Sequence, residues 1–155
     1  MQLQRERDTR PEMALRRELH RRGLRYRVDL PVVPGTRRRR VDIAFTRAKV
    51  AVFVDGCFWH GCPNHGQRTH LVNGHYWPGK IAGNKARDLD TDERLTGAGW
   101  VVVRLWEHEP AESGVERVVA ALAEHSPASL RRNLPAPTPG ESATVLGSIV
   151  APDEL

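Results

Sequence analysis

An apolar run at residues 50–54 leads directly into a loop that is unusually rich in metal-binding side chains. The run, Val-Ala-Val-Phe-Val, predicts a buried strand. The loop follows with Asp-Gly-Cys-Phe-Trp-His-Gly-Cys-Pro-Asn-His at residues 55–65, and it holds both cysteines of the chain. A hydrophobic core has little use for two thiols, two imidazoles and a carboxylate in one place. The stretch therefore predicts a functional site at the end of a strand.

The length of 155 residues predicts one domain with a real core, which we expect to span residues 1–126. Residues 127–155 are rich in Pro, Ser, Ala and Gly and are expected to form a flexible tail. No apolar run is long enough for a membrane span and no signal-peptide pattern opens the chain, so we expect a cytoplasmic protein. In that compartment a Cys-x4-Cys pair more often binds a metal than forms a disulfide.

The chain carries a formal net charge of +5, and arginine dominates its basic side, with four consecutive arginines at 37–40. A basic chain favours polyanions such as nucleic acids, because neutralised phosphates release counterions. A run of charge is also typical of an ordinary solvated face. Charge alone therefore leaves nucleic-acid binding open.

The periodicity of apolar residues predicts an α/β domain with a mixed sheet. A helix begins with a Thr9 cap and Pro11 in its first turn, and ends before Gly23. The remaining elements are strands at 26–30, 41–45 and 49–54, a helix at 80–97, a strand at 100–106 and a helix at 111–124. In this order the loops that carry the candidate site cluster at one end of the sheet.

A zinc site is the first chemistry that the loop suggests. Cys57, Cys62 and His65 supply three of the four ligands that a closed structural zinc site needs. His108, just beyond the strand at 100–106, is the expected fourth ligand, because a neighbouring strand can end beside this loop. The alternative is two ordinary reduced cysteines and a surface histidine.

A second site is suggested by acidic residues on apolar elements. Asp42 alternates with Val41, Ile43 and Phe45, which places it on the opposite side of its strand from that apolar set. Glu12 shares a helix face with the apolar stripe of the first helix. Together with the end of the strand at 49–54, both could hold Mg²⁺ through oxygen ligands. A solvated sheet face for Asp42 and a simple capping role for Glu12 are the alternatives.

His60 lies between two expected zinc ligands and need not be one itself. Near a hydrated Mg²⁺ it could act as a general base, with Asp88 or Asp55 orienting its ring. It could also face solvent or compete for the zinc.

Aromatic and polar residues near the loop suggest contacts with nucleic acid. Phe58, Trp59 and Trp77 are expected in loops, where they could stack on bases or wedge between them, or could merely cover the zinc loop. Lys80 and Asn84 form a polar stripe with Asp88 along the helix at 80–97.

These residues together resemble the very-short-patch-repair (Vsr) mismatch endonucleases over about residues 5–125. The matching segments are Arg-Asp-Thr-Arg-Pro-Glu at 7–12, Arg-Val-Asp-Ile at 40–43, Val-Phe-Val-Asp-Gly-Cys-Phe-Trp-His-Gly-Cys-Pro at 52–63, Tyr-Trp at 76–77, Lys-Ile at 80–81, Asn84, Arg-Asp at 87–88, Gly-Trp at 99–100 and Leu-Trp-Glu at 105–107. The resemblance implies a restriction-endonuclease-like fold and Mg²⁺-dependent nicking of one DNA strand, 5′ to the thymine of a T:G mismatch. Such mismatches arise when 5-methylcytosine deaminates, and these enzymes typically accompany a cytosine-5 DNA methyltransferase.

The resemblance also implies a role for each residue. Asp42 would be the central Mg²⁺ ligand, helped by the backbone carbonyl of Val54, with Glu12 reaching the metal site. His60 would be the general base and Asp88 its partner. The structural zinc would use Cys57, Cys62, His65 and His108. The DNA, bound by a monomer, would meet Phe58, Trp59, Trp77, Lys80 and Asn84.

The chain departs from the family pattern at Asp55, where the pattern has histidine. A carboxylate there could bind metal or hold His60, but it would repel phosphate. Cysteine and histidine are also exchanged at Cys62 and His108, and His65 is shifted by one residue. The alternative functions are a restriction-associated or defence nickase without mismatch preference, and a zinc-stabilised DNA-binding module that has lost catalysis.

Overall fold

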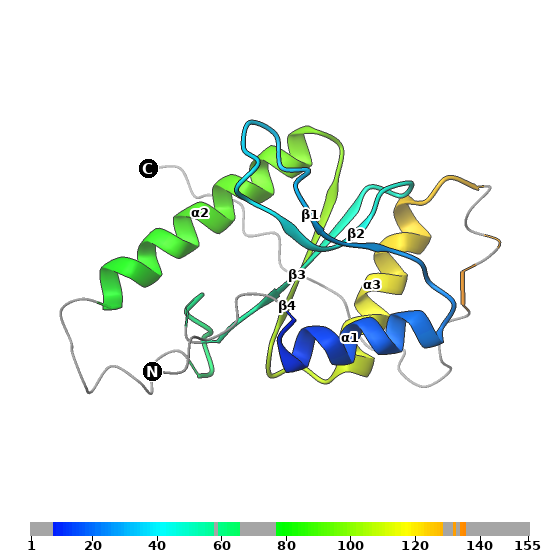
Figure 1. Cartoon of the computed structure of the whole chain (residues 1–155), viewed down its shortest axis with the longest axis horizontal. Coiled ribbons are helices and arrows are strands. Elements are labelled where there is room, and N and C mark those ends of the chain that lie inside the picture. The colour runs from blue at the N-terminus through cyan, green and yellow to red at the C-terminus, as the bar shows by residue number, and fades with distance from the viewer. Residues whose placement is uncertain (1–7, 58, 66–76, 129–131, 133, 136–155) are drawn as a thin grey trace, which may run out of the picture.

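The computed structural model describes residues 8–57, 59–65, 77–128, 132, 134 and 135. Seven elements follow the order expected from the sequence (Figure 1): α1 Arg10–Arg21, β1 Arg27–Leu30, β2 Val41–Phe45, β3 Val50–Asp55, α2 Trp77–Gly97, β4 Val101–Trp106 and α3 Ala111–His125. Most of the tail expected at residues 127–155 lies outside the described residues. In the part of the chain that the structure describes, no helix is long and apolar enough to cross a membrane.

The four strands form one mixed sheet in the order β1-β2-β3-β4. The pairs β1–β2 and β2–β3 are antiparallel, whereas β3 and β4 run parallel, with Asp55 beside Trp106 at their common end. The apolar run at 50–54 is thus in a central strand, as its composition predicts. A parallel pair sends both strands out of the sheet at the same edge, and the candidate site lies at that edge.

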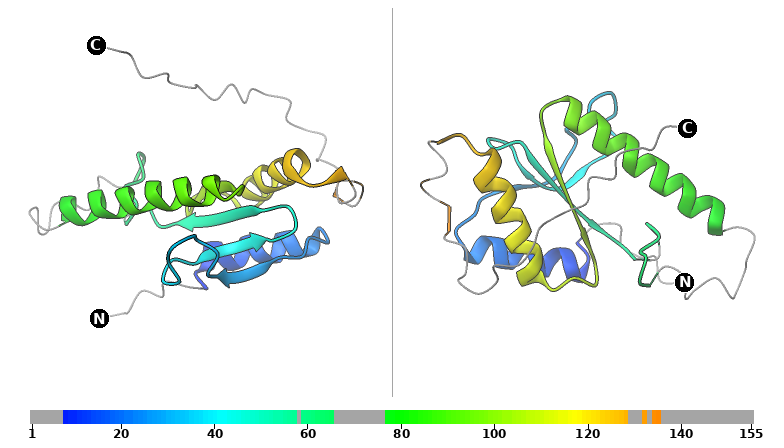
Figure 2. Two further views of the ribbon diagram at one scale, coloured as in Figure 1. Left: turned by 90° about the horizontal axis from the view of Figure 1, so that it is seen from above. Right: turned by 180° about the vertical axis from the view of Figure 1, so that it is seen from behind.

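Two hydrophobic clusters cover the two faces of the sheet. Helices α1 and α3 lie on one side of the strands and α2 on the other (Figures 1 and 2). The larger cluster joins α1 and α3 to the sheet and includes the fully buried Leu19. The smaller cluster includes Leu95 of α2 and Phe53 of β3. Each helix buries one stripe against the sheet, which fixes its polar stripe relative to the site.

The capping of α1 follows the sequence prediction and brings Glu12 inward. The Thr9 hydroxyl accepts a hydrogen bond from the Glu12 N–H at 3.4 Å. Glu12 lies on the same face as the buried Leu15 and Leu19, and only 3% of its surface is exposed. The helical period thus places a carboxylate under the sheet.

Two sequence predictions about local structure are wrong. Trp77 is the first residue of α2 and does not lie in a loop, since α2 begins three residues earlier than expected, with Pro78 in its first turn. Val41 does not pack with Ile43 and Phe45 but joins the smaller cluster with Val33. The pairing of β2 with β3 covers Ile43, Ala44 and Phe45, so Val41 lies beyond it and is paired only with Leu30 of β1, which also packs against the smaller cluster.

A close approach at Gly114 sets how near α3 comes to α1 and β4. A Cβ atom on this residue would lie 3.0 Å from Leu105 Cδ1 and 3.3 Å from Leu15 Cδ1. We expect Gly114→Val to lower the free energy of unfolding by about 2 kcal/mol, because the packed core cannot absorb the added methyl groups. Urea denaturation measures this change.

Gly83 provides the matched control, since a Cβ there meets nothing within 4 Å among the described residues. Gly83→Val should leave the free energy of unfolding within about 0.5 kcal/mol of the wild type. If Gly114→Val is as stable as Gly83→Val, the close approach does not constrain the fold.

Candidate active site and metal centre

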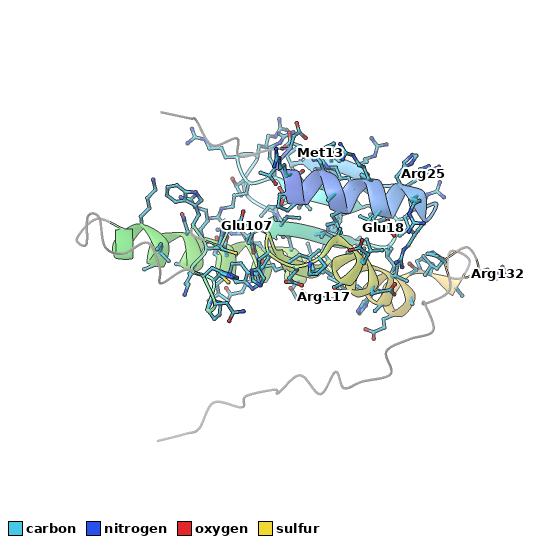
Figure 3. All side chains as sticks on the ribbon, turned by 90° about the horizontal axis from the view of Figure 1, so that it is seen from below. Met13, Glu18, Arg25, Glu107, Arg117 and Arg132 are labelled. Carbon is cyan, nitrogen blue, oxygen red and sulfur yellow. The ribbon has the colours of Figure 1, made fainter. Side chains whose placement is uncertain are left out.

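The loops after β3 and β4 are bound to each other where the two strands end. The Glu107 N–H donates to the Asp55 carbonyl at 3.0 Å, which continues the parallel pairing by one residue. In return the Cys57 N–H donates to Oε1 of Glu107 at 2.8 Å. Glu107, labelled in Figure 3, directly follows β4. These bonds hold the cysteine loop against the segment that carries His108.

Cys57, Cys62, His65 and His108 form one cluster whose potential ligand atoms all lie within 4.8 Å of one another. Nδ1 of His108 is 3.1 Å from Cys57 Sγ and 3.7 Å from Cys62 Sγ. Nδ1 of His65 is 3.9 Å and 3.8 Å from the same two sulfurs. Ligand atoms around a tetrahedral zinc are separated by about 3.3–3.8 Å, given zinc–ligand bonds of about 2.0–2.3 Å. The cluster can therefore hold one tetrahedral metal ion, and His108 is correctly placed to complete it.

The chemistry of the cluster also favours a bound cation. Burial, together with the neighbouring Cys62 and Glu107, raises the pKa of Cys57 to about 11. Both thiols are buried and neither forms a disulfide. A cation would supply the positive charge that two adjacent thiolates need.

Asp42 lies where β2 separates from β3. Beyond the Ile43–Val52 pair, the carboxylate of Asp42 accepts the Val54 N–H at 2.9 Å, in the place of a backbone partner. Burial and the charges of Glu12 and Asp55 raise the pKa of Asp42 to about 6, although the bond from Val54 and the charge of Arg16 oppose the increase. The groups near Asp42 therefore supply too little positive charge to offset its burial, as expected of a carboxylate that binds a cation.

Glu12 lies beside Asp42 but is already held by other groups. Its carboxylate forms an ion pair with Arg16 and accepts the Asp8 N–H at 2.9 Å. Arg16 also contacts the Asp8 carboxylate at 2.7 Å. The expected nearness of Glu12 to Asp42 is present, and Arg16 is a buried partner that the sequence did not reveal.

His60 is oriented by Asp88 from α2. Nδ1 of His60 is 2.5 Å from Oδ2 of Asp88 and 3.8 Å from Oδ1 of Asp55. The bond to Asp88 raises the pKa of His60, burial opposes this, and the charge of Asp55 adds to the increase. With Nδ1 committed to a carboxylate, Nε2 is the nitrogen that can exchange a proton with another molecule. The contact of His60 with Asp88 is one of the two that the sequence analysis suggested for orienting this ring.

Asp55 is engaged by Arg104, a residue that the sequence analysis did not single out. Both oxygens of Asp55 lie 3.0 Å from Nη1 of Arg104. Burial raises the pKa of Asp55, and Arg104 and His60 partly offset the increase. Burial alone would lower the pKa of Arg104, but its bonds to Asp92 and Asp55 raise it. The available signal was a lone arginine among the apolar residues of the strand at 100–106.

The polar stripe of α2 faces the loop. The Asn84 amide donates to the Trp59 carbonyl at 2.9 Å, and the Lys80 ammonium lies 4.9 Å from the centre of the Trp59 ring. Lys80, Asn84 and Asp88 thus all contact the loop at Trp59 and His60. Phe58 and the side chain of Trp77 lie outside the described residues.

Fold and site together define an α/β protein with an acid–histidine group beside a cysteine–histidine cluster. The model of the family "DNA mismatch endonuclease Vsr" matches residues 1–65. The type II nicking enzyme V.NaeI of Lentzea aerocolonigenes is 47% identical over 123 residues, which cover 79% of this chain and 74% of that enzyme. The type II nicking enzyme V.XorIIP of Xanthomonas oryzae pv. oryzae is 39% identical over 117 residues, with coverages of 74% and 81%.

A further relative is the DNA mismatch endonuclease Vsr of Escherichia coli. It is 33% identical over 101 residues, which cover 65% of this chain and 62% of that protein. The chain belongs to the Vsr endonuclease family, as the residues around the site indicated.

The cysteine–histidine cluster leads to a prediction about metal content. We expect the purified protein to carry about one tightly bound transition-metal ion per chain, and Cys62→Ser to lose it and unfold at a lower temperature. Elemental analysis and thermal unfolding measure the two effects. His125→Ala, which removes an exposed histidine of α3 outside the cluster, should keep the metal. A wild-type protein that stays metal-free after incubation with Zn²⁺ would rule the site out.

Asp42 leads to a prediction about stability and pH. Its pKa of about 6 lies above the ordinary value of 3.8, so the folded protein favours the neutral acid. The resulting stability is present below about pH 4 and is lost as Asp42 ionises up to about pH 6. Asp42→Asn, which can still accept the Val54 N–H, should raise the free energy of unfolding of the metal-free protein at pH 7 by about 1–3 kcal/mol.

Urea denaturation at pH 4 and pH 7 measures this difference, which should nearly vanish at pH 4. Glu93→Gln, at an exposed position of α2, is the control and should show no such pH dependence. If Asp42→Asn is no more stable than wild type at pH 7, the carboxylate is not short of positive charge.

Proposed function

We propose that this protein is a Mg²⁺-dependent DNA endonuclease that nicks one strand of duplex DNA, 5′ to the thymine of a T:G mismatch. The observation that carries the proposal is the His60–Asp88 pair. It lies at the same edge of the sheet as Asp42, a carboxylate whose pKa is raised by burial. Membership of the Vsr family supplies the substrate class. The proposal includes a restriction-endonuclease-like fold, a monomer on DNA and a functional link to a cytosine-5 DNA methyltransferase.

Asp42 and the backbone carbonyl of Val54 are proposed to hold the Mg²⁺. An extended residue directs its N–H and C=O toward the same neighbour, so the Val54 carbonyl faces the side where its N–H meets Asp42. Oxygen ligands of this kind suit Mg²⁺, and the high pKa of Asp42 fits a position that a cation completes. A bound Mg²⁺ would stabilise the charge that develops on the phosphate.

His60 is proposed to take a proton from the attacking water through Nε2. Asp88 holds Nδ1 and so fixes both the tautomer and the orientation of the ring. Glu12, paired with Arg16, lies near Asp42 as an additional negative charge that favours metal binding. Asp55 belongs to the same charged group through its contact with His60.

The cysteine–histidine cluster is proposed to be a structural zinc site. Cys57, Cys62, His65 and His108 fill all four positions of a tetrahedral ion and leave none for a substrate. The zinc would fold the loop that carries His60, and take no part in the chemistry.

Trp59 is proposed to meet the bases beside the mismatch, with Phe58 and Trp77 completing a wedge. Asn84 and Lys80 hold Trp59 from α2, which would let its ring act as a rigid surface for stacking. The ammonium of Lys80 is also suited to the DNA backbone.

A nickase without mismatch preference is the second candidate. The relatives that are 47% and 39% identical are named nicking enzymes, and their names do not mention a mismatch. The third candidate is a DNA-binding module without catalytic activity. Observed nicking of DNA would exclude it.

A nicking assay on three duplexes distinguishes these functions. The duplexes differ only in having T:G, T:A or C:G at one position, and each strand carries its own label. We expect Mg²⁺-dependent nicking of the thymine strand of the T:G duplex alone. His60→Ala and Asp42→Asn should lower the rate at least about 100-fold, since each removes a group that acts on the reacting atoms.

His20→Ala, at an exposed histidine of α1, is the matched control and should nick at the wild-type rate. Equal nicking of all three duplexes would support the nickase without mismatch preference. Binding of DNA without cutting in Mg²⁺ or Mn²⁺ would refute an endonuclease.

A further inference from the structure

We propose that Arg104 is a positioning residue that fixes the two carboxylates next to Nδ1 of His60. The proposal rests on the proposed role of His60 as the general base. Arg104 lies on β4, one residue before the buried Leu105, and its side chain reaches β3 and α2. It would act through Asp55 and Asp88, without touching the DNA.

Arg104 contacts both of the acidic residues that lie next to the His60 ring. Nη1 lies 3.0 Å from both oxygens of Asp55 and 3.7 Å from Oδ1 of Asp88. Nη2 lies 3.4 Å from the backbone carbonyl of Asp88. The other oxygen of Asp88, Oδ2, is the one bound to His60. One guanidinium therefore holds both acids that approach Nδ1 of the imidazole.

Arg104 is itself held firmly. Its Nε donates to both oxygens of Asp92 at 3.0 Å, and Nη2 donates to Oδ1 of Asp92 at 2.8 Å. The guanidinium also lies over the Phe53 ring, 4.4 Å from its centre. Because the guanidinium group of Arg104 is bound to α2 on one side and to the sheet on the other, it has little conformational freedom. It can therefore hold Asp55 and Asp88 in fixed positions.

This arrangement gives Asp55 a function in a chain that departs from the family pattern at this position. A free carboxylate there would repel a phosphate or compete for a metal ion. Arg104 instead offsets part of its charge and binds both of its oxygens from β4. In this proposal Asp55 is a partner of Arg104 in orienting His60.

Lysine cannot replace arginine in this role. The ammonium of a lysine is a single point of charge, whereas the planar guanidinium contacts Asp55 through Nη1, the Asp88 carbonyl through Nη2, and Asp92 through Nε and Nη2. Arg104→Lys therefore tests geometry while it keeps the charge.

The experiment compares Arg104→Lys and Arg104→Ala with Asp92→Asn. Asp92→Asn weakens the link from Arg104 to α2 but leaves the contacts with Asp55 and Asp88. We measure kcat and KM for nicking of the T:G duplex at saturating Mg²⁺, the melting temperature, and the NMR signal of the His60 Nδ1 proton. That signal is assigned by its loss in His60→Gln.

Both Arg104 variants should lower kcat about 10–100-fold, with KM nearly unchanged, and should lose the Nδ1 proton signal. Guanidinium ion, added well below denaturing concentrations, should restore part of the kcat of Arg104→Ala, and methylammonium should not. Asp92→Asn should lower the melting temperature and keep both kcat and the signal. If Arg104→Ala does not fold, Arg104→Lys decides.

The proposal is overturned if the folded Arg104 variants keep the signal and the wild-type kcat. The proposal is also overturned if Asp92→Asn lowers kcat as much as the two Arg104 variants do. Arg104 would then affect kcat only by stabilising the fold. A wild-type protein that nicks none of the three duplexes refutes the proposed function instead. The dependence of the His60 signal on Arg104 would still be measurable in that protein.

Discussion

The parallel pairing of β3 with β4 is the constraint on which the whole site depends. Because the two strands run in the same direction and end together at Asp55 and Trp106, the loops that follow leave the sheet side by side. Cys57 and His108 each lie two residues beyond that shared end, and their side chains meet at 3.1 Å. An antiparallel β4 would have carried His108 to the other end of the sheet. The direction of one edge strand thus decides whether the cysteine–histidine cluster exists.

The separation of β2 from β3 determines which carboxylate remains available to a cation. Two of the buried acids have a guanidinium partner, since Arg16 pairs with Glu12 and Arg104 with Asp55. Asp42 is compensated by the N–H of Val54 and by the more distant charge of Arg16, which do not offset its burial, so its pKa is raised to about 6. Glu12 and Asp55 therefore each have a guanidinium partner, whereas the charge of Asp42 is offset less completely. A fold that was optimised for stability alone would not bury an acid in this way.

The sequence predicted the elements and the cysteine–histidine cluster because each leaves a local pattern, whereas the choice of Asp88 over Asp55 as the partner of His60 came from the resemblance to the Vsr endonucleases. Apolar periods of two and of 3.6 residues mark strands and helices, and ligand types at short spacing mark a metal site. Arg104 leaves no such pattern, because its partners come from β3 and α2 and meet it only in the folded chain. The packing of Val41 was missed for a similar reason, since it depends on where the pairing of β2 with β3 ends.

The loop between Asp55 and His65 combines the two halves of the site in one short segment. The His60 N–H donates to the Gly56 carbonyl at 3.1 Å, and the Cys62 N–H donates to the Cys57 carbonyl at 2.9 Å. These turns place His60 between two cysteines in the sequence of the loop, while its ring contacts Asp88 of α2. A metal ion on the cysteines would remove the freedom of the backbone on both sides of the histidine, so its ring could be oriented by Asp88 at little further entropic cost. The orientation of His60 by Asp88 would for this reason depend on metal binding by the cysteine–histidine cluster, although the two groups share no side chain.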